Sequence, residues 1–213
     1  MRFLRLNSVL VLLLAAGCAN PYKQLQQVPK TSSALRFQPK FEKELYRCVV
    51  DGKILFKKFH LSGLLFFKSF EDGSTRAVFQ NEMGISFFDF KWDDKDSFRV
   101  VSIMPQLDKP ALIKTLRKDF NLLLMKGLDS VTEVQLLHDK DSAYRFTLDN
   151  GYAYYLVQRG GLTTIENAGK RKPVTTIDLL RKKGDHALPE SISFLHHKAH
   201  FTIQLSKINQ DAP

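Results

Sequence analysis

Histidines, cysteines and carboxylates are the side chains that could bind a metal ion or carry out catalysis. His196, His197 and His200 form the run H-H-K-A-H near the C-terminus. On a strand, His196 and His197 point to opposite faces, so only His196 and His200 could share a metal ion. Because no carboxylate or thiolate stands at ligand spacing beside them, the run is more typical of the polar end of a hairpin. We therefore predict no metal site and no cofactor.

Catalytic motifs have equally little support. The sequence contains no G-x-S-x-G nucleophile elbow, and Gly160-Gly161 lacks the strand-to-helix context of a phosphate-binding loop. The carboxylates are scattered over expected strand ends and turns, with no pair suited to acid–base work. Cys48 has no base beside it in sequence, which favours a buried, small apolar role over a reactive one. The residues thus indicate a protein that is not an enzyme.

The N-terminal segment has the pattern of a targeting signal. Arg2 and Arg5 precede an uninterrupted apolar run over residues 9–16, and small residues stand directly before Cys18. An apolar run of about 7–15 residues is typical of a signal-peptide core, whereas a membrane-spanning helix needs about 20. The segment resembles a bacterial lipoprotein signal, which implies acylation of the Cys18 thiol. The alternative is an ordinary secretory signal with an incidental cysteine.

This resemblance implies membrane lipid as a partner, because several acyl chains on Cys18 would anchor the chain stably. Ala19 follows the cysteine. A residue other than Asp at this position implies the outer membrane, by the sorting rule of many such proteins. Export excludes cytoplasmic nucleic acid as a partner of this basic chain. Removing Arg2 and Arg5 with the signal lowers the net charge from +10 to +8, which suits an anionic membrane surface or simply reflects solvated lysines.

The chain is expected to divide into four parts. These are a signal peptide over residues 1–17, an acylated Cys18 with a flexible tether up to residue 40, one β-domain over residues 41–208, and a tail over residues 209–213. The tether is predicted because its Gln-, Ser- and Pro-containing composition offers few large apolar groups. With 44% hydrophobic residues and 17 phenylalanines in the chain, the remainder has the apolar surface that disordered chains lack.

Most of the folded part has the pattern of β-strands. Residues 144–149 and 152–157 flank Asn150-Gly151, a strong hairpin signal. Residues 199–208 alternate apolar and polar side chains as a last strand, whereas residues 85–92 are partly apolar on both faces. Strands of the second kind fit a curved sheet whose outer face meets solvent and whose inner face has more apolar wall than one helix can cover.

One helix interrupts these strands. Asp108 is a plausible N-cap, Pro110 suits the first turn, and Gly127 is a natural stop. The apolar residues at helical spacing are Leu112, Ile113, Leu116, Phe120, Leu123 and Leu124. We expect the helix to pack on the sheet rather than lie on a membrane surface. The predicted fold class is mainly β, a strongly curved antiparallel sheet (a half or unclosed barrel) with an amphipathic helix packed across its concave face.

The order of these parts resembles that of the LolA/LolB family of lipoprotein carriers. The local likeness is closest over residues 76–88, where Met83 stands before Gly84 at the place of an exposed apolar tip, and Glu82 replaces a proline. The resemblance implies that Glu82, Met83 and Gly84 form a loop that inserts its exposed apolar residue into the membrane. The alternative is that Met83 packs against the rest of the domain. Residues 84–124 also look like uncharacterised lipoproteins of Bacteroidota-type bacteria.

The same resemblance implies an apolar cavity for acyl chains, since a curved sheet can enclose one. The residues expected to line it are Leu64, Phe66, Phe79, Phe87, Val101, Ile103, Leu116 and Phe120. For each of them, ordinary core packing is the alternative.

Taken together, the resemblance implies a monomeric outer-membrane lipoprotein facing the periplasm. It would bind the acyl chains of lipoproteins, receive them from a LolA-like periplasmic carrier, and help insert them into the membrane. The alternative is a non-catalytic lipid- or protein-binding lipoprotein of the same fold in an envelope complex. A third reading, a periplasmic hydrolase, lacks residues to support it.

Overall fold

The structure is a computed structural model, and it describes Tyr22 and residues 25–54, 57–128, 132–138, 141–169, 172–181 and 188–208. The predicted signal peptide, Cys18 and C-terminal tail lie outside these residues. None of the described helices is long and apolar enough to cross a membrane.

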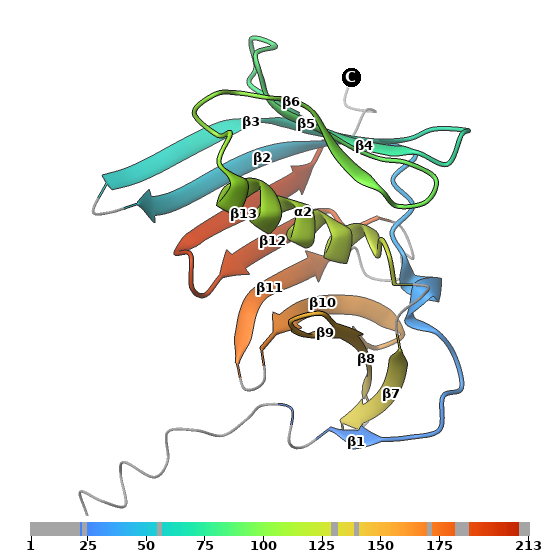
Figure 1. Cartoon of the computed structure of the whole chain (residues 1–213). Helices are drawn as coiled ribbons and strands as arrows, with labels where there is room; N and C mark the ends of the chain where they lie inside the picture. Colours follow the sequence, from blue (N-terminus) through green and yellow to red (C-terminus); the bar gives the residue numbers. More distant parts are fainter. Residues whose placement is uncertain are drawn as a thin grey trace, which may run out of the picture.

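Thirteen strands of the described residues form one antiparallel sheet in the order β1-β7-β8-β9-β10-β11-β12-β13-β2-β3-β4-β5-β6. The elements are β1 (Gln26–Gln27), the 3₁₀ helix η3 (Ala34–Phe37), β2 (Lys43–Ile54), β3 (Lys57–Ser69), β4 (Thr75–Gln80), β5 (Ser86–Trp92), β6 (Phe98–Ile103), α2 (Pro110–Leu124), β7 (Glu133–His138), β8 (Asp141–Leu148), β9 (Gly151–Gln158), β10 (Gly161–Ala168), β11 (Pro173–Leu180), β12 (Ser191–His196) and β13 (Phe201–Lys207). β1 and β6 are the edges, so the curved sheet is not closed into a barrel, and α2 lies across its concave side (Figure 1). This confirms the predicted fold class.

The ends of α2 differ slightly from those expected. Pro110 does occupy the first turn, where its missing N–H costs no hydrogen bond, but Lys109 rather than Asp108 is the N-cap residue. At the other end, Met125 adopts the left-handed conformation (φ 52°), and its N–H bonds to the carbonyls of Asn121 and Leu122. The helix therefore ends at Leu124, three residues before Gly127.

Phe120 lies at the centre of the core. Its side chain is 1% exposed. Aromatic rings from three strands surround it, with ring centroids 5.9–6.3 Å away: Phe67, Phe88, Phe90, Trp92 and Phe194. Such mostly tilted and edge-to-face contacts are the favoured geometry of aromatic pairs. The aromatic side chains of the sequence thus fix α2 against the concave face.

The hairpin predicted at Asn150-Gly151 is confirmed, with its loop one residue earlier than the dipeptide. Leu148 of β8 pairs with Gly151 of β9, so Asp149 and Asn150 form the loop. Gly151 has φ +99°, and a Cβ there would lie 2.1 Å from the carbonyl oxygen of Ala168. Glycine is needed both for the backbone angle and for the close approach of β10.

The segment predicted as a flexible tether is docked on the sheet from Leu25 onward. Its strand β1 pairs with β7, and Ala34 in η3 is fully buried. The composition-based prediction did not include the polar partners that the folded sheet supplies. Gln135 of β7, for example, accepts hydrogen bonds from the backbone N–H and the hydroxyl of Thr31.

Candidate functional site

An apolar cavity of about 660 Å³ lies between the N-terminal half of α2 and the inner face of the sheet. Strands β2 to β5 and β13 form its wall, and the loop before α2 closes one side. The lining residues are Cys48, Val50, Phe59, Leu61, Leu65, Phe79, Phe88, Gln106, Leu107, Lys109, Ala111, Leu112, Thr115, Leu116, Phe120, Ala199, Phe201 and Ile203. Nearly all are apolar, so the cavity suits a hydrocarbon rather than a polar ligand.

Local sequence explains why space remains here. The helix presents the small side chains of Ala111 and Thr115 to this part of the sheet, whereas one turn further Phe120 fills the core. On the wall, Gly52 pairs with both Phe59 and Phe201. A Cβ at Gly52 would lie 2.3 Å from the Phe59 ring and 2.7 Å from the Phe201 Cβ, so glycine lets these two aromatic residues approach each other.

The structure brings together three of the eight residues expected to line a cavity: Phe79, Leu116 and Phe120. Leu64 and Phe66 occupy the positions of β3 that alternate with the lining residue Leu65, and both are half-buried on the other face.

The remaining three expected residues lie outside the lining. Phe87 is buried, with its ring centroid 4.6 Å from that of Phe79. Ile103 packs partly buried against the core, and Val101 is 46% exposed on the edge strand β6.

Several lining residues were missed by the sequence reasoning. In β3, the polar residues Lys58, His60 and Ser62 alternate with Phe59 and Leu61. This period of two places the odd-numbered residues on the inner face, so the pattern could have identified Phe59 and Leu61.

The connection between β4 and β5 carries an exposed apolar tip. Met83 is 82% exposed and Ile85 is 50% exposed. The Asn81 carboxamide oxygen accepts hydrogen bonds from the backbone N–H groups of both, at 3.0 and 2.8 Å. Gly84 has a φ of +84°, a backbone angle that glycine adopts without steric cost. Glu82 is exposed, and its carboxylate oxygen lies 3.8 Å from the Arg47 guanidinium. The turn therefore holds two apolar side chains out in solvent.

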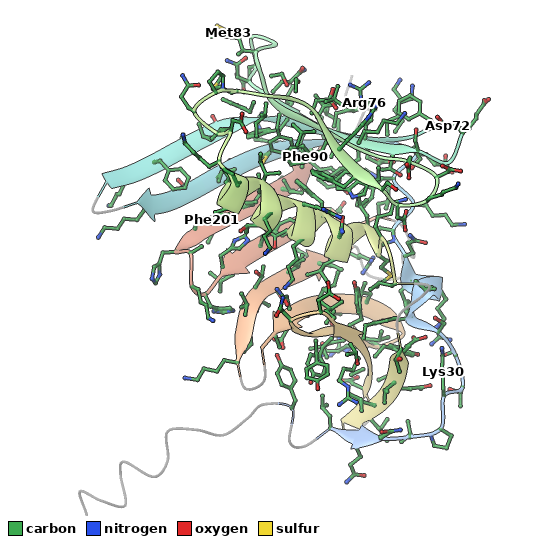
Figure 2. The ribbon with its side chains drawn as sticks, viewed as in Figure 1. Lys30, Asp72, Arg76, Met83, Phe90 and Phe201 are labelled. Carbon is green, nitrogen blue, oxygen red and sulfur yellow. The ribbon has the colours of Figure 1, made fainter. Side chains whose placement is uncertain are left out.

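The exposed tip and the cavity lie on the same hairpin. Phe79 of β4 and Phe88 of β5 pair across the two strands and both line the cavity. Met83 stands at the end of this hairpin, pointing away from the helix (Figure 2). One hairpin thus carries both two cavity-lining residues and the exposed apolar tip.

A buried Asp–His pair fixes the helix next to the cavity. His196 Nε2 lies 2.6 Å from the Asp119 carboxylate, and His196 Nδ1 lies 3.2 Å from the carbonyl oxygen of Phe201. Because a carbonyl only accepts, this contact assigns the proton to Nδ1, while Nε2 faces the Asp119 carboxyl group. Burial raises the pKa of Asp119 above its usual range, although the hydrogen bond from His196 opposes this shift. The pair joins α2 to β12.

The same pair positions a cavity residue. The Phe201 ring stacks on the His196 imidazole with centroids 3.8 Å apart, and Phe201 lines the cavity. His200 has φ +53° in the turn before β13. Among the described residues, no group of three or more His, Cys, Asp or Glu side chains is arranged to hold a metal ion.

Cys48 contributes to the cavity wall as a small apolar group. It is a free cysteine in the described part of the chain and is 2% exposed. Burial raises the pKa of its thiol to about 12, so the reactive thiolate is scarce at neutral pH.

No family model and no curated protein matches the sequence. Among solved structures, a domain assigned to outer membrane lipoprotein sorting from Vibrio parahaemolyticus superposes with a TM-score of 0.50 and 7% identity, over 84% of this chain and 89% of that chain. A LolA superfamily protein from Nitrosomonas europaea gives a TM-score of 0.49 and 8% identity, over 84% of this chain and 91% of its own. The unclosed antiparallel sheet with its crossing helix is thus similar in fold to the Vibrio parahaemolyticus domain.

Proposed function

We propose that this protein is an outer-membrane lipoprotein, anchored through acylated Cys18, that binds the acyl chains of other lipoproteins and helps to insert them into the membrane. The observation that supports this most directly is the apolar cavity beside an exposed apolar tip on one hairpin. The protein would face the periplasm, act as a monomer without enzymatic activity, and receive its lipoproteins from a LolA-like carrier.

The size and chemistry of the cavity suit this task. A volume of about 660 Å³ lies within the range of about 300–1,000 Å³ typical of small-ligand sites. Each methylene group moved from water into apolar surroundings contributes about 0.8 kcal/mol, so a single alkyl chain is held without polar recognition. Binding of this kind is non-directional, which suits a ligand that has to be passed on to a membrane.

Blocking the cavity tests the binding step. Thr115→Trp places an indole where Thr115 faces the cavity, and we expect the affinity for a fluorescent fatty acid to fall at least ten-fold, since about 1.4 kcal/mol of lost contact suffices. Lys114→Trp is the matched control, because Lys114 is exposed on the same helix and does not line the cavity. Unchanged binding by Thr115→Trp would show that the hydrocarbon binds elsewhere.

Charging the tip tests the insertion step. Met83→Glu should leave fatty-acid binding unchanged but slow the release of an acylated lipopeptide into liposomes about ten-fold or more, because a carboxylate resists entry into the apolar layer. Phe70→Glu is the control, since Phe70 is 37% exposed just after β3, at the β3–β4 turn. Normal release by Met83→Glu would remove the tip from the mechanism and favour a protein that binds lipid without inserting it.

A further inference from the structure

The N-terminal strap, which we define as Tyr22 and residues 25–33, is held on the sheet by specific contacts. The Tyr22 ring stacks on Tyr154 of β9, with centroids 3.9 Å apart and planes 2° from parallel. The Tyr22 hydroxyl donates a hydrogen bond of 2.7 Å to Glu166 of β10. In addition, Gln26 and Gln27 pair with Leu137 and Leu136 of β7. The strap thus covers one edge of the sheet.

Glu133 at the start of β7 holds the end of the strap. Its carboxylate accepts hydrogen bonds from the Ser33 hydroxyl at 2.9 Å and the Ala34 N–H at 2.6 Å, and Lys30 Nζ lies 2.5 Å away. Partial burial acts to raise the pKa of Glu133, but the contacts with Lys30, Ala34 and Ser33 outweigh it, and the pKa lies below its usual range. The carboxylate is therefore charged and engaged at neutral pH.

The strap and the main core are packed separately. Tyr22 and Leu25 pack against a small apolar cluster of Leu136, Ala143, Tyr154 and Ala168, which is distinct from the main core. Ala34, in contrast, belongs to the main core and is 0% exposed. Detaching the strap therefore breaks polar contacts, including that of the Ser32 hydroxyl with the Tyr144 hydroxyl at 2.9 Å, but removes no side chain from the main core.

The docked strap limits the reach of an anchor at Cys18. Cys18 and Tyr22 are four residues apart, which spans at most about 14 Å of extended chain. In the sheet order, ten strand spacings of about 4.8 Å, or about 48 Å along the curve, separate β1 from β4. Met83 and β1 lie at opposite ends of the molecule (Figures 1 and 2). With the strap docked, an anchor at Cys18 keeps the β1 edge near the membrane and the tip turned away.

We propose that the docked strap shortens the tether between the acylated Cys18 and the folded domain, and that the strap can detach to lengthen it. We call the docked strap the lock. When it detaches, the free chain from Cys18 to Ala34 spans up to about 55 Å, and the domain can turn the Met83 tip toward the membrane that holds its own anchor. This inference rests on the proposed function, because it needs both an acylated Cys18 and an inserting tip. Detachment then becomes a required step of insertion into that membrane.

A reversible cross-link tests the lock in the full-length acylated protein bound to liposomes. Gln26 and Leu137 are exposed register partners on β1 and β7, so Gln26→Cys with Leu137→Cys can form a disulfide that keeps the strap docked. We expect the oxidised variant to bind fatty acid normally but to insert a labelled lipopeptide into its own liposome at least ten-fold more slowly than after reduction with dithiothreitol. Thr164→Cys with Asp178→Cys, register partners of β10 and β11, is the control cross-link and should have no effect.

The outcomes separate this inference from the proposed function. If the oxidised and reduced forms insert at the same rate, the strap is not a lock, and the inference is overturned while the insertion function stands. If the wild type also fails to insert, the proposed function itself fails. Tyr22→Ala, which removes both the ring stack and the hydrogen bond to Glu166, should insert faster than the wild type; equal or slower insertion contradicts the lock.

Discussion

Replacing Phe120 with alanine is expected to lower the free energy of unfolding by about 3–5 kcal/mol. The ring is 1% exposed and contacts aromatic residues of β3, β5 and β12, so its loss leaves a hole where the helix meets the sheet. For a domain of this size the melting temperature should fall by about 2–4 °C per kcal/mol. Denaturant unfolding followed by the fluorescence of Trp92, the one tryptophan of the chain, measures the change.

Trp92 fluorescence reports on the contact between α2 and the sheet as well as on unfolding of the whole domain, because Trp92 contacts two residues of the helix. Its ring centroid lies 6.3 Å from that of Phe120, and its indole N–H donates a 2.6 Å hydrogen bond to the Asn121 side chain. Ile113→Ala is the control, because Ile113 is only half-buried on the same helix, and it should cost about 1 kcal/mol or less. A cost below about 1 kcal/mol for Phe120→Ala would show that α2 does not fill the core.

Phe120→Ala should also change ligand binding, since Phe120 lines the cavity. The enlarged apolar space can accept more of a hydrocarbon chain, as engineered apolar cavities do. Added fatty acid should therefore restore more stability to this variant than to the wild type, because a ligand stabilises the state that binds it.

Removing His196 is the second change with a large expected effect. His196→Ala leaves the Asp119 carboxylate buried without its partner, and breaking one side of a buried pair costs about 3–5 kcal/mol. The double variant Asp119→Leu with His196→Leu removes both polar groups and should cost less than the single change. The difference between single and double variants in urea unfolding gives the coupling energy.

The loss in His196→Ala should depend on pH. Burial already raises the pKa of Asp119, and the variant also lacks the hydrogen bond from His196 that opposes this shift. A folded-state pKa above the unfolded value of about 3.9 means that the folded state binds the Asp119 proton more tightly than the unfolded state. The contribution of Asp119 to the free energy of unfolding is therefore greatest at low pH and is lost as the pH rises through the folded-state pKa. The stability difference from the wild type should therefore be larger at pH 7.5 than at pH 4.5; an equal difference would contradict the assigned cause.

Local elements were predictable because nearest neighbours along the chain specify them. Pro110 and the spacing from Leu112 to Leu124 predict the helix, and it forms over Pro110–Leu124. The Asn150-Gly151 dipeptide predicts a hairpin, and β8 and β9 form it. In each case the signal is a backbone requirement or a short period, which needs no knowledge of the rest of the fold.

The lining of the cavity was less predictable because both faces of β3 carry apolar residues. Leu64 and Phe66 were expected to line it, yet the lining includes Leu65 and, further along the strand, Phe59 and Leu61. A one-residue difference in register moves every side chain to the other face of a strand. The alternation of Phe59 and Leu61 with His60 and Ser62 does indicate which residues of β3 face inward. It does so only in the first half of the strand, where the outward-facing residues are polar.

The sequence pattern alone thus predicts several of the strands, the amphipathic helix and the targeting pattern that ends at Cys18, because these depend on residues adjacent in sequence. The exposed tip at Met83 was implied only by the resemblance to a known family. Tertiary structure alone shows that small helix residues such as Ala111 leave a cavity opposite the sheet. It also shows that His196 reaches Asp119 across 77 positions of sequence, and that the polar N-terminal segment docks on β7. These features depend on partners brought together by sheet curvature, and a window along the sequence contains only one side of each contact.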